Sequence, residues 1–401
     1  MLNTTFVLKI FEGFSIDRWN DLVRPFDIIE MDKAGEKMVL AYIIGKFEEY
    51  AGAKVDWDWL VYSSLFDLLK KIALCDIKSP VQRMIRTEYP GEYKKLDQWV
   101  LDQYKNLIDQ DLYGRFRSYL TESPAETTLT ARIRRAAHKF STQRELDMIA
   151  PVNEPERLQR IRKGVAADLV EYLDLRGVQE LVSKQRPFDF LMCVEQLRFQ
   201  IRWNQTPRVP KTSVLGHSFF VAVLTLLLGR ECGVPLCPRR RFNNFFSGLF
   251  HDLPEAVTRD IISPVKRATG GLPEIIKNIE DKIAEKELQP LMEDFYRDEL
   301  AYFSANEFDN RILENGLPRI VTFEELNGRC NRDDCSPVDG ALVRSADQIA
   351  AFIEADQSIR YGTTSPHLVE GRDGLLQTYR DAPPINGFDI AEFFRVYWES
   401  Y

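Results

Sequence analysis

Histidine is scarce in this chain, so imidazole chemistry has few candidates: the 401 residues include four histidines. His217 opens one apolar segment, and His251 precedes Asp252 near the end of another. Asp347 lies inside a third, VRSADQIAAFIEA. Two imidazoles and two carboxylates form a mixed ligand set suited to one divalent ion, Mn²⁺, Co²⁺, Fe²⁺, Ni²⁺ or Zn²⁺. Four ligands leave coordination positions for water and a phosphoryl oxygen, as a hydrolytic metal requires.

The residues around His251 and Asp252 favour a metal site over the ordinary alternative, a satisfied core histidine. The pair stands in the apolar run FFSGLFHDLP, where burying charge is costly unless the charges are paired or bind a metal. Glu255 follows His251 by four residues, which predicts a position one turn further along the same helical face. A carboxylate there could exchange a proton with the attacking or leaving oxygen.

A longer ordered series contains these candidates. It comprises, in chain order, Arg202-Trp203, Gly216-His217-Ser218, His251-Asp252, Glu255, Asp260, Ser263-Pro264-Val265-Lys266 and Asp347. This series, spanning about residues 190–360, resembles the HD-domain phosphohydrolases and is most similar to the YfbR-like 5′-deoxynucleotidases.

The resemblance implies a role for each matched residue. His217, His251, Asp252 and Asp347 would together bind one divalent metal ion. Glu255 would be the catalytic acid or base. Asp260 matches a family aspartate close to the substrate, and we count it with Glu255 among the catalytic residues.

The resemblance also implies how the substrate is held. Arg202 and Trp203 match an Arg-Trp pair that contacts phosphate and sugar, with the tryptophan disfavouring a 2′-hydroxyl. Lys266, which closes the Ser-Pro-Val-Lys motif, joins them as a substrate-binding residue. Independently of the family, a guanidinium grips phosphate oxygens with two hydrogen bonds. An indole wall leaves an added hydroxyl without a partner, which costs binding.

The function expected from these residues is metal-dependent hydrolysis of (deoxy)nucleoside 5′-monophosphates to nucleoside and phosphate. Two alternatives stay open. The same site could act on nucleoside triphosphates, cyclic nucleotides or another phosphoester. The chain could also be a non-catalytic regulatory HD module, although such a module has no need of an intact ligand set and Glu255.

The elements expected to position these residues are helices. Apolar residues recur at three- and four-residue spacing over 160–183, 217–230, 241–257, 274–303 and 339–357. Segment 217–230 is apolar all round, which predicts a central buried helix. The weak strand candidate is 319–324. We therefore predict an all-α fold, with segment 304–338 inserted before the Asp347 helix and able to reshape the substrate mouth.

Parts of the sequence repeat at a nearly constant offset. The core D-I-x-S-P-V-x-R begins at Asp76 and again at Asp260, 184 residues later (260 minus 76). Arg18-Trp19 echoes Arg202-Trp203 at the same offset. These matches predict tandem HD-domain helical bundles, a degenerate one at 1–185 without a catalytic metal and a catalytic one at 186–401.

The predicted degenerate half departs from the ligand pattern at each position. Glu36 is expected opposite His217, Asp67-Leu68 opposite the His-Asp pair, Lys71 opposite Glu255 and Gly164 opposite Asp347. Such a half could serve as an internal pseudo-partner of the catalytic half. An internal pseudo-dimer is therefore expected, and a homo-oligomer of the whole chain stays open.

Composition narrows the partners and the compartment. The net charge is −8, with 53 Lys and Arg against 61 Asp and Glu, so a nucleotide-sized substrate is expected rather than duplex nucleic acid. No apolar run is long enough to span a membrane, and no secretory signal is recognised at the N-terminus. Six cysteines indicate reduced thiols in a cytoplasmic protein. The pairs Cys232/Cys237 and Cys330/Cys335 could bind a structural zinc, but plain loop cysteines are the favoured interpretation.

Overall fold

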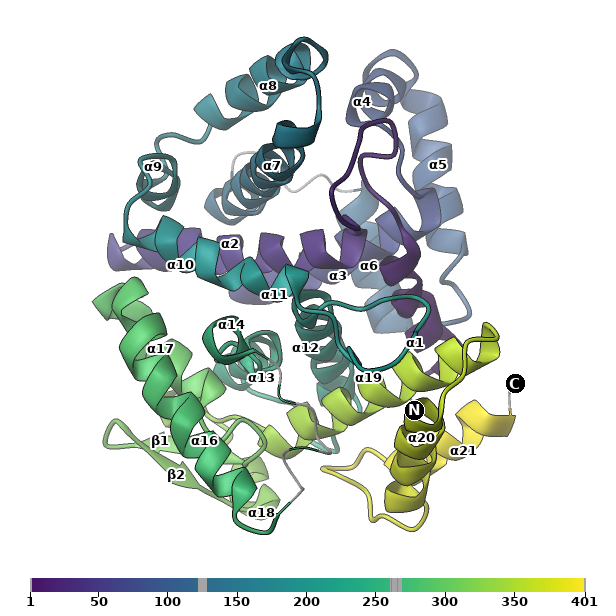
Figure 1. Cartoon of the computed structure of the whole chain (residues 1–401), viewed down its shortest axis with the longest axis vertical. Coiled ribbons are helices and arrows are strands. Elements are labelled where there is room, and N and C mark those ends of the chain that lie inside the picture. The colour runs from purple at the N-terminus through teal and green to yellow at the C-terminus, as the bar shows by residue number, and fades with distance from the viewer. Residues whose placement is uncertain (1, 122–127, 260, 262–264, 266–268, 400–401) are drawn as a thin grey trace.

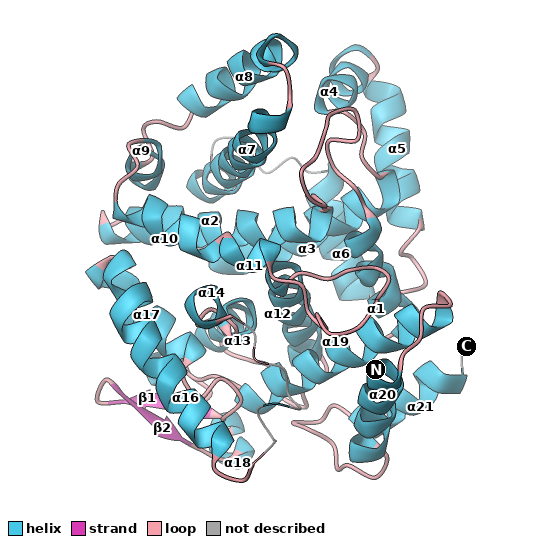
Figure 2. Ribbon diagram, in the orientation of Figure 1, coloured by secondary structure: helices cyan, strands magenta, loops and turns pink. Residues whose placement is uncertain are grey.

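The computed structural model describes residues 2–121, 128–259, 261, 265 and 269–399, and in them the chain is mainly helical (Figures 1 and 2). The strands of these residues form one antiparallel hairpin, β1 (Arg311–Glu314) and β2 (Leu317–Ile320). The all-α prediction is confirmed. The strand expected at 319–324 is half right, because β2 ends at Ile320 and Thr322 then caps a short helix.

The helical elements of the first half, including 3₁₀ turns η1 and η2, run in order as follows: α1 (Thr4–Phe11), η1 (Glu12–Ser15), α2 (Glu30–Tyr50), α3 (Trp57–Leu74), α4 (Ser79–Glu88), α5 (Pro90–Asp102), α6 (Gln110–Thr121), α7 (Leu129–Ile149), η2 (Ala150–Val152), α8 (Pro155–Val170) and α9 (Arg176–Val182).

Those of the second half, with the hairpin between α17 and α18, are α10 (Arg186–Val194), α11 (Gln196–Phe199), α12 (Val214–Arg230), α13 (Pro238–Phe250), α14 (Glu255–Thr258), α16 (Leu272–Ile283), η3 (Ala284–Leu288, a π-helical turn), η4 (Gln289–Leu291), α17 (Asp294–Ser304), α18 (Phe323–Asn327), η5 (Asp333–Cys335), α19 (Gly340–Arg360), α20 (Pro366–Tyr379) and α21 (Ile390–Glu399). α1 packs against α21, so the two ends of the chain lie on one side of the molecule (Figure 1).

α12 is the central helix that the sequence predicts at 217–230, and it begins three residues earlier. The hydroxyl of Ser213 accepts the N–H of Gly216 at 2.9 Å and caps the helix. Its residues from Val214 to Leu228 are all buried, as a uniformly apolar sequence requires. α2, α13 and α19 pack around it.

Other predicted helices are shorter than expected. The segment 160–183 is divided between α8 and α9, and 241–257 is interrupted after Phe250. The segment 274–303 is broken by η3 and η4 before α17 begins. Pro254 and Pro290 stand at two of these breaks, where the missing backbone N–H cannot continue the helical hydrogen bonds. The helix predicted at 339–357 is α19.

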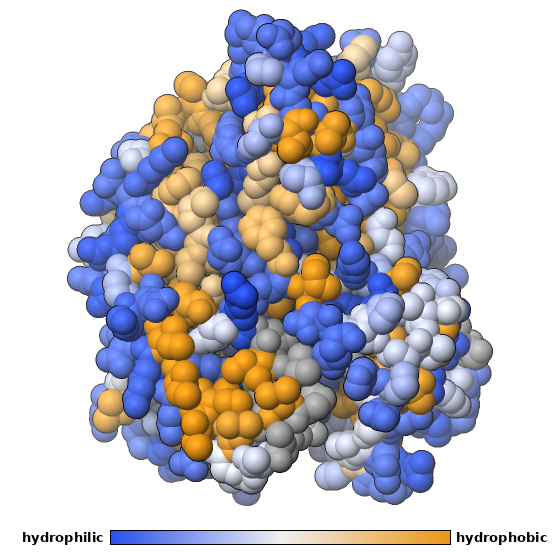
Figure 3. Space-filling view, viewed as in Figure 1, coloured by the Kyte–Doolittle hydropathy of each residue, from blue (hydrophilic) through white to orange (hydrophobic). Residues whose placement is uncertain are grey.

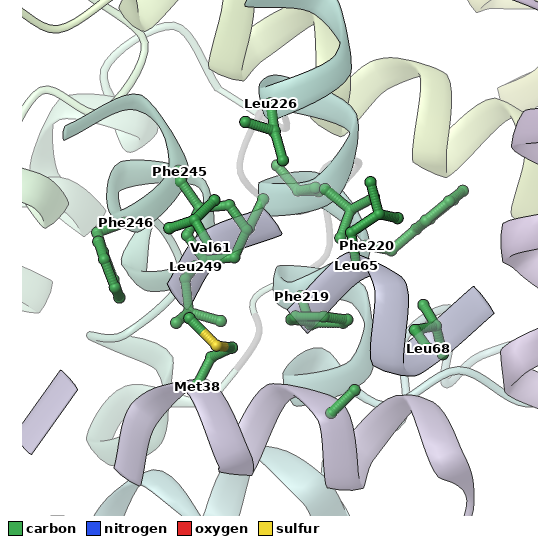
Figure 4. Close-up of a cluster of buried hydrophobic side chains, with 14 of the residues drawn as sticks. Met38, Val61, Leu65, Leu68, Phe219, Phe220, Leu226, Phe245, Phe246 and Leu249 are labelled. Atoms are coloured by element: carbon green, nitrogen blue, oxygen red, sulfur yellow. The ribbon is translucent and has the colours of Figure 1, made fainter. Parts of the chain in front are cut away.

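One hydrophobic core joins the two halves. Its largest cluster contains side chains from α2 and α3 as well as from α12 and α13. Figure 4 shows Met38, Val61 and Leu65 of the first half beside Phe219 and Phe245 of the second. The halves therefore share buried apolar surface instead of each enclosing a separate core.

α2 and α12 approach each other closely at two glycines. A Cβ on Gly35 would lie 3.1 Å from the carbonyl oxygen of Leu215, and one on Gly216 would lie 2.7 Å from Oδ1 of Asp32. A buried ion pair, Arg198 Nη2 to Glu36 Oε2 at 2.8 Å, also joins the halves. Small residues and buried charge thus fix how the two halves pack.

Local contacts of the first half recur in the second at the offset of 184. Each half has an isolated bridge that leads into its long helix, and each places a tryptophan at positive φ. The bridge Asp17–Ile29 of the first half corresponds to Ile201–Ser213 of the second. Trp19 (φ 59°) corresponds to Trp203 (φ 58°). These recurrences support the duplication, which stays a prediction together with its boundary near residue 185.

The visible surface is mostly hydrophilic, with an apolar patch over α16 (Figure 3). Ile275 and Ile279 are its half-exposed members on that helix. Among the helices of the described residues, none is both long enough and apolar enough to cross a membrane.

Candidate metal centre

Three helices bring the predicted ligands together. His217 is the fourth residue of α12, directly after the cap that Ser213 provides. His251 is the C-terminal cap residue of α13, and Asp252 follows it in the turn. Asp347 lies on α19, which packs against both α12 and α13.

The ligand atoms lie close enough to share one ion. One side-chain atom each of His217, His251 and Asp252 lies within 4.8 Å of the other two, and this is the one such group of His, Cys, Asp and Glu among the described residues. Asp347 Oδ1 lies 3.0 Å from His217 Nε2. The structure therefore groups three of the four predicted ligands and places the fourth, Asp347, beside His217.

An oxygen acceptor lies behind each histidine ring, at Nδ1. Nδ1 of His251 lies 2.8 Å from the carbonyl oxygen of Gly248 and donates to it. Nδ1 of His217 lies 3.1 Å from Oε1 of Glu354, and its Nε2 lies 3.0 Å from Oδ1 of Asp347. Metal-ligating histidines are held in this way by a carbonyl or carboxylate behind them.

Unpaired buried atoms support a cation here. Nε2 of His251 and Oδ2 of Asp252 lie 3.1 Å apart, but neither makes a hydrogen bond of good geometry within the described residues. Burial would lower the pKa of His251, yet Asp252 and Asp347 outweigh it and raise the pKa to about 9. Burial would raise the pKa of Asp252, but His251 and Arg202 hold it below its usual range. This group of residues thus stabilises added positive charge, which fits a divalent ion.

Glu354 lies behind the site, and the sequence analysis did not identify it. Its carboxylate accepts hydrogen bonds from the indole Nε1 of Trp203 (2.9 Å), Nε of Arg202 (3.2 Å) and the hydroxyl of Thr212 (3.1 Å), besides that of His217. Burial would raise the pKa of Glu354, but Arg202 and His217 lower it well below its usual range. One ionised carboxylate therefore positions a ligand and both members of the Arg-Trp pair.

Arg202 points its remaining nitrogens at the predicted ligands. Nη1 lies 3.7 Å from Asp252 Oδ2, and Nη2 lies 3.9 Å from Asp347 Oδ1. Trp203 instead packs its ring against α20, where a Cβ on Gly371 would lie 2.6 Å from the indole. The guanidinium faces the ligand cluster, and the indole is fixed beside it.

A family comparison identifies this region. The family model described as HD domain matches residues 194–375, which include all four predicted ligands, Arg202, Trp203 and Glu354. The chain contains an HD domain. HD domains are typically metal-dependent phosphohydrolases, so the match and the possible His/Asp site together support a metal-dependent hydrolase. No curated protein matches the chain.

Glu255 lies within the HD domain at a helix start, not on the helix of His251 as its spacing predicted. α13 ends at Phe250, and α14 begins at Glu255 after a turn that contains Pro254. The N–H of Glu255 donates to the carbonyl oxygen of Asp252 at 3.0 Å, which ties the residue to the ligand turn. Its side chain is buried. Two other predicted site residues, Asp260 and Lys266, lie outside the described residues.

The inserted segment 304–338 reaches the candidate centre. The ring of Phe308 lies 6.3 Å from that of His251, centroid to centroid. The segment also forms the hairpin and α18, which pack a small core of their own around Ile312 and Leu326. Its effect on the substrate mouth stays a prediction.

The cysteine pairs show no zinc-site geometry. The one candidate metal group of the described residues contains no cysteine, although Cys232, Cys237, Cys330 and Cys335 are all described. Asn386 donates to Cys232 at 3.3 Å.

Proposed function

We propose that the HD domain hydrolyses the phosphomonoester of nucleoside 5′-monophosphates, with a preference for deoxynucleotides. The observation that carries this proposal is the guanidinium of Arg202, which lies beside the ligand group of His217, His251 and Asp252 and beside Asp347. A cation-binding group next to a phosphate-binding group is what hydrolysis of a phosphomonoester dianion needs.

The four ligands would hold one divalent ion, Mn²⁺, Co²⁺, Fe²⁺, Ni²⁺ or Zn²⁺. When bound, such an ion neutralises phosphate charge and makes water a better nucleophile near neutral pH. Glu354 would keep Nε2 of His217 available to the ion by accepting from Nδ1, and the Gly248 carbonyl would do the same for His251. Both rings are therefore oriented with Nε2 toward the other ligands.

Arg202 supplies the phosphate contact in this proposal. Glu354 accepts from its Nε, so the two terminal nitrogens remain directed toward the ligand cluster. Their planar arrangement matches two oxygens of a phosphoryl group. Replacing Arg202 by lysine would lose this geometry while keeping the positive charge.

Glu255 moves the proton in this proposal. It follows Asp252 by one tight turn, and its burial keeps bulk water from competing for the carboxyl oxygens. A carboxyl placed so can accept a proton from the attacking water or protonate the O5′ of the leaving nucleoside.

Trp203 discriminates the sugar in this proposal. Glu354 and Gly371 hold the indole from two sides, so it cannot easily move to admit a larger substrate. A 2′-hydroxyl meeting a fixed indole face loses its hydrogen bonds to water without gaining a partner.

A phosphoester panel tests the reaction. Purified chain with added Mn²⁺ or Co²⁺ is assayed for released phosphate on dAMP, AMP, dATP, a cyclic nucleotide and p-nitrophenyl phosphate, with Asp252→Ala as the metal-site control. We expect dAMP to have the highest kcat/KM, and Trp203→Ala to narrow the gap between dAMP and AMP. Preferred turnover of dATP or the cyclic nucleotide would redirect the proposal to those substrates. Absence of turnover on every ester would favour a regulatory module.

A further inference from the structure

The first half contains a counterpart of the arrangement behind the metal centre. Arg18 Nε and the indole Nε1 of Trp19 both donate to the carboxylate of Glu145, at 3.0 and 2.9 Å. In the second half, Arg202 and Trp203 donate in the same manner to Glu354. The carboxylate that organises the candidate centre thus has an equivalent on α7.

This equivalence places Lys33 opposite His217. Lys33 is the fourth residue of α2 and His217 is the fourth of α12, and each approaches the rear carboxylate of its own half. Lys33 Nζ lies 3.3 Å from Glu145 Oε2. Glu36, which the sequence had matched to His217, instead pairs with Arg198 and accepts from Ser141.

The same equivalence places His138 opposite Asp347. His138 precedes Glu145 by seven residues, and Asp347 precedes Glu354 by seven. Gly164, the match suggested by the sequence, lies on α8 with no atom near a Cβ built on it. α7 therefore corresponds to α19.

These substitutions reverse the charge of the site. At the offset of 184, Asp67 and Leu68 stand opposite His251 and Asp252, and Lys71 stands opposite Glu255. Lysine thus replaces one histidine ligand and the predicted acid–base glutamate. We call the four cations Arg18, Lys33, Lys37 and Lys71, together with the uncharged imidazole of His138 among them, the N-terminal cationic cluster.

Two members of the N-terminal cationic cluster are left without a partner. Arg18 pairs with Glu30 and Glu145, Lys33 with Glu145, and Lys37 with Asp67. Within the described part of the chain, no hydrogen bond or ion pair holds the ammonium of Lys71 or the ring nitrogens of His138. Both side chains are partly exposed, so a solute can reach them.

The electrostatic fields of Arg18, Lys33, Lys37 and Lys71 act together on the ring of His138. Burial lowers the pKa of His138 well below its usual range, and Lys33, Lys37, Arg18 and Lys71 lower it further. Burial also lowers the pKa of Lys71, and Arg18 and Lys37 add to this effect against Glu30 and Asp76. Lysine that lacks an ion pair beside other cations is a favourable position for an anion.

We propose that the N-terminal cationic cluster binds the dianionic phosphate of a phosphomonoester without hydrolysing it. Lys71 supplies the free ammonium, and Lys33 stands where the catalytic half would hold its metal. The first half contains no candidate metal group among its described residues, so it has no hydrolytic ion to offer. The proposal does not depend on turnover by the HD domain.

Calorimetric titration of the full chain in EDTA tests this site, because chelation removes any metal from the catalytic half. The probes are inorganic phosphate and dAMP. We expect saturable binding, weakened about tenfold or more in Lys71→Met and kept within about threefold in Lys71→Arg. Lys105→Met removes an exposed lysine elsewhere and should bind like the parent, and Arg202→Met measures how much of the binding belongs to the HD domain. Tighter binding of dAMP than of phosphate would identify a nucleotide as the source of the anion, and equal binding would identify the free ion.

A second variant, at His138, tests the same site in case Lys71→Met fails to fold. His138→Gln keeps a polar side chain of similar size and should weaken binding by about threefold or more, while circular dichroism reports the fold of every variant. Two results would overturn the proposal. One is no saturable binding of either probe below about 10 mM. The other is binding that Arg202→Met removes and Lys71→Met leaves intact.

Discussion

Glu354 shows how one residue can determine the chemistry of its neighbours. Its carboxylate lies within hydrogen-bond distance of His217, Arg202 and Trp203, so it orients an imidazole, a guanidinium and an indole together. We expect Glu354→Gln to lower divalent-metal affinity by about 10- to 100-fold, the usual effect of losing a carboxylate behind a ligating histidine. Competition with a fluorescent chelator measures this. Glu370→Gln, an exposed position on α20, is the matched control, and equal affinities in the two variants would contradict the assignment.

The ligand set makes a prediction about stoichiometry. His251→Ala or Asp252→Ala each removes an atom that has no hydrogen-bond partner among the described residues, so the fold should survive while the ion is lost. Elemental analysis of the purified protein should give about one ion per chain in the parent and none in either variant. Unchanged metal content in both variants would remove the basis of the proposed chemistry. Two ions per chain would place a metal in the first half as well.

Glu255 is not counted among the ligands, which separates its role from theirs. We expect Glu255→Gln to retain the ion and to lose about 10² to 10⁴ in kcat, the range typical of general acid–base groups. Metal analysis and kcat are therefore measured on the same preparation, with a flattened pH–rate profile as the signature of a lost proton donor or acceptor. Near-normal kcat with full metal content would show that another carboxylate moves the proton.

At the scale of elements, the sequence predicted where helices occur better than where they end. It also did not predict correctly which residues of the two halves correspond. α12 was predictable because its residues are apolar on every side. Glu255 was placed on the wrong element because periodicity does not register the break at Pro254. Glu354 follows Asp347 by two helical turns, which was a usable signal: a single carboxylate in the apolar run AAFIEA needs a partner. The match of Lys33 to His217 was not predictable, because only the contact of Lys33 with Glu145 favours Lys33 over Glu36 at this position.

The crossing of α2 and α12 makes a prediction about pH. Burial raises the pKa of Asp32 to about 6, Glu145 adds to this, and Arg198 and the Ser213 hydroxyl act against it. The unfolded value is about 3.9, so folding favours the protonated carboxyl and stability falls as pH rises from about 4 to 6. Asp32→Asn keeps the acceptor for Ser213 and does not titrate. It should gain about 2–3 kcal/mol relative to the parent between pH 4 and 7, measured by urea unfolding. A difference that stays constant with pH would contradict this.

At the scale of the whole molecule, the first half covers α12, the central helix of the second half. Phe220 of α12 packs its ring against Phe11 and Phe14, at centroid distances of 5.9 and 6.0 Å. The carbonyl of Leu215 lies against Gly35. We propose on this basis that residues 1–185 act as an internal pseudo-partner, present at high effective concentration because the two halves are one chain. Such a role would explain how a half without the predicted metal ligands is retained.

Separating the halves tests this arrangement. The fragment 186–401 would expose the buried face of α12, so we expect it to be poorly soluble or to dimerise through that face. Sedimentation velocity gives its mass in solution, and phosphate release gives its activity. Co-expression with 1–185 is the control and should restore a soluble one-to-one complex. A fragment that stays monomeric, stable and fully active would contradict the pseudo-partner role. In that case the N-terminal cationic cluster, or recruitment of another protein, would have to account for the first half.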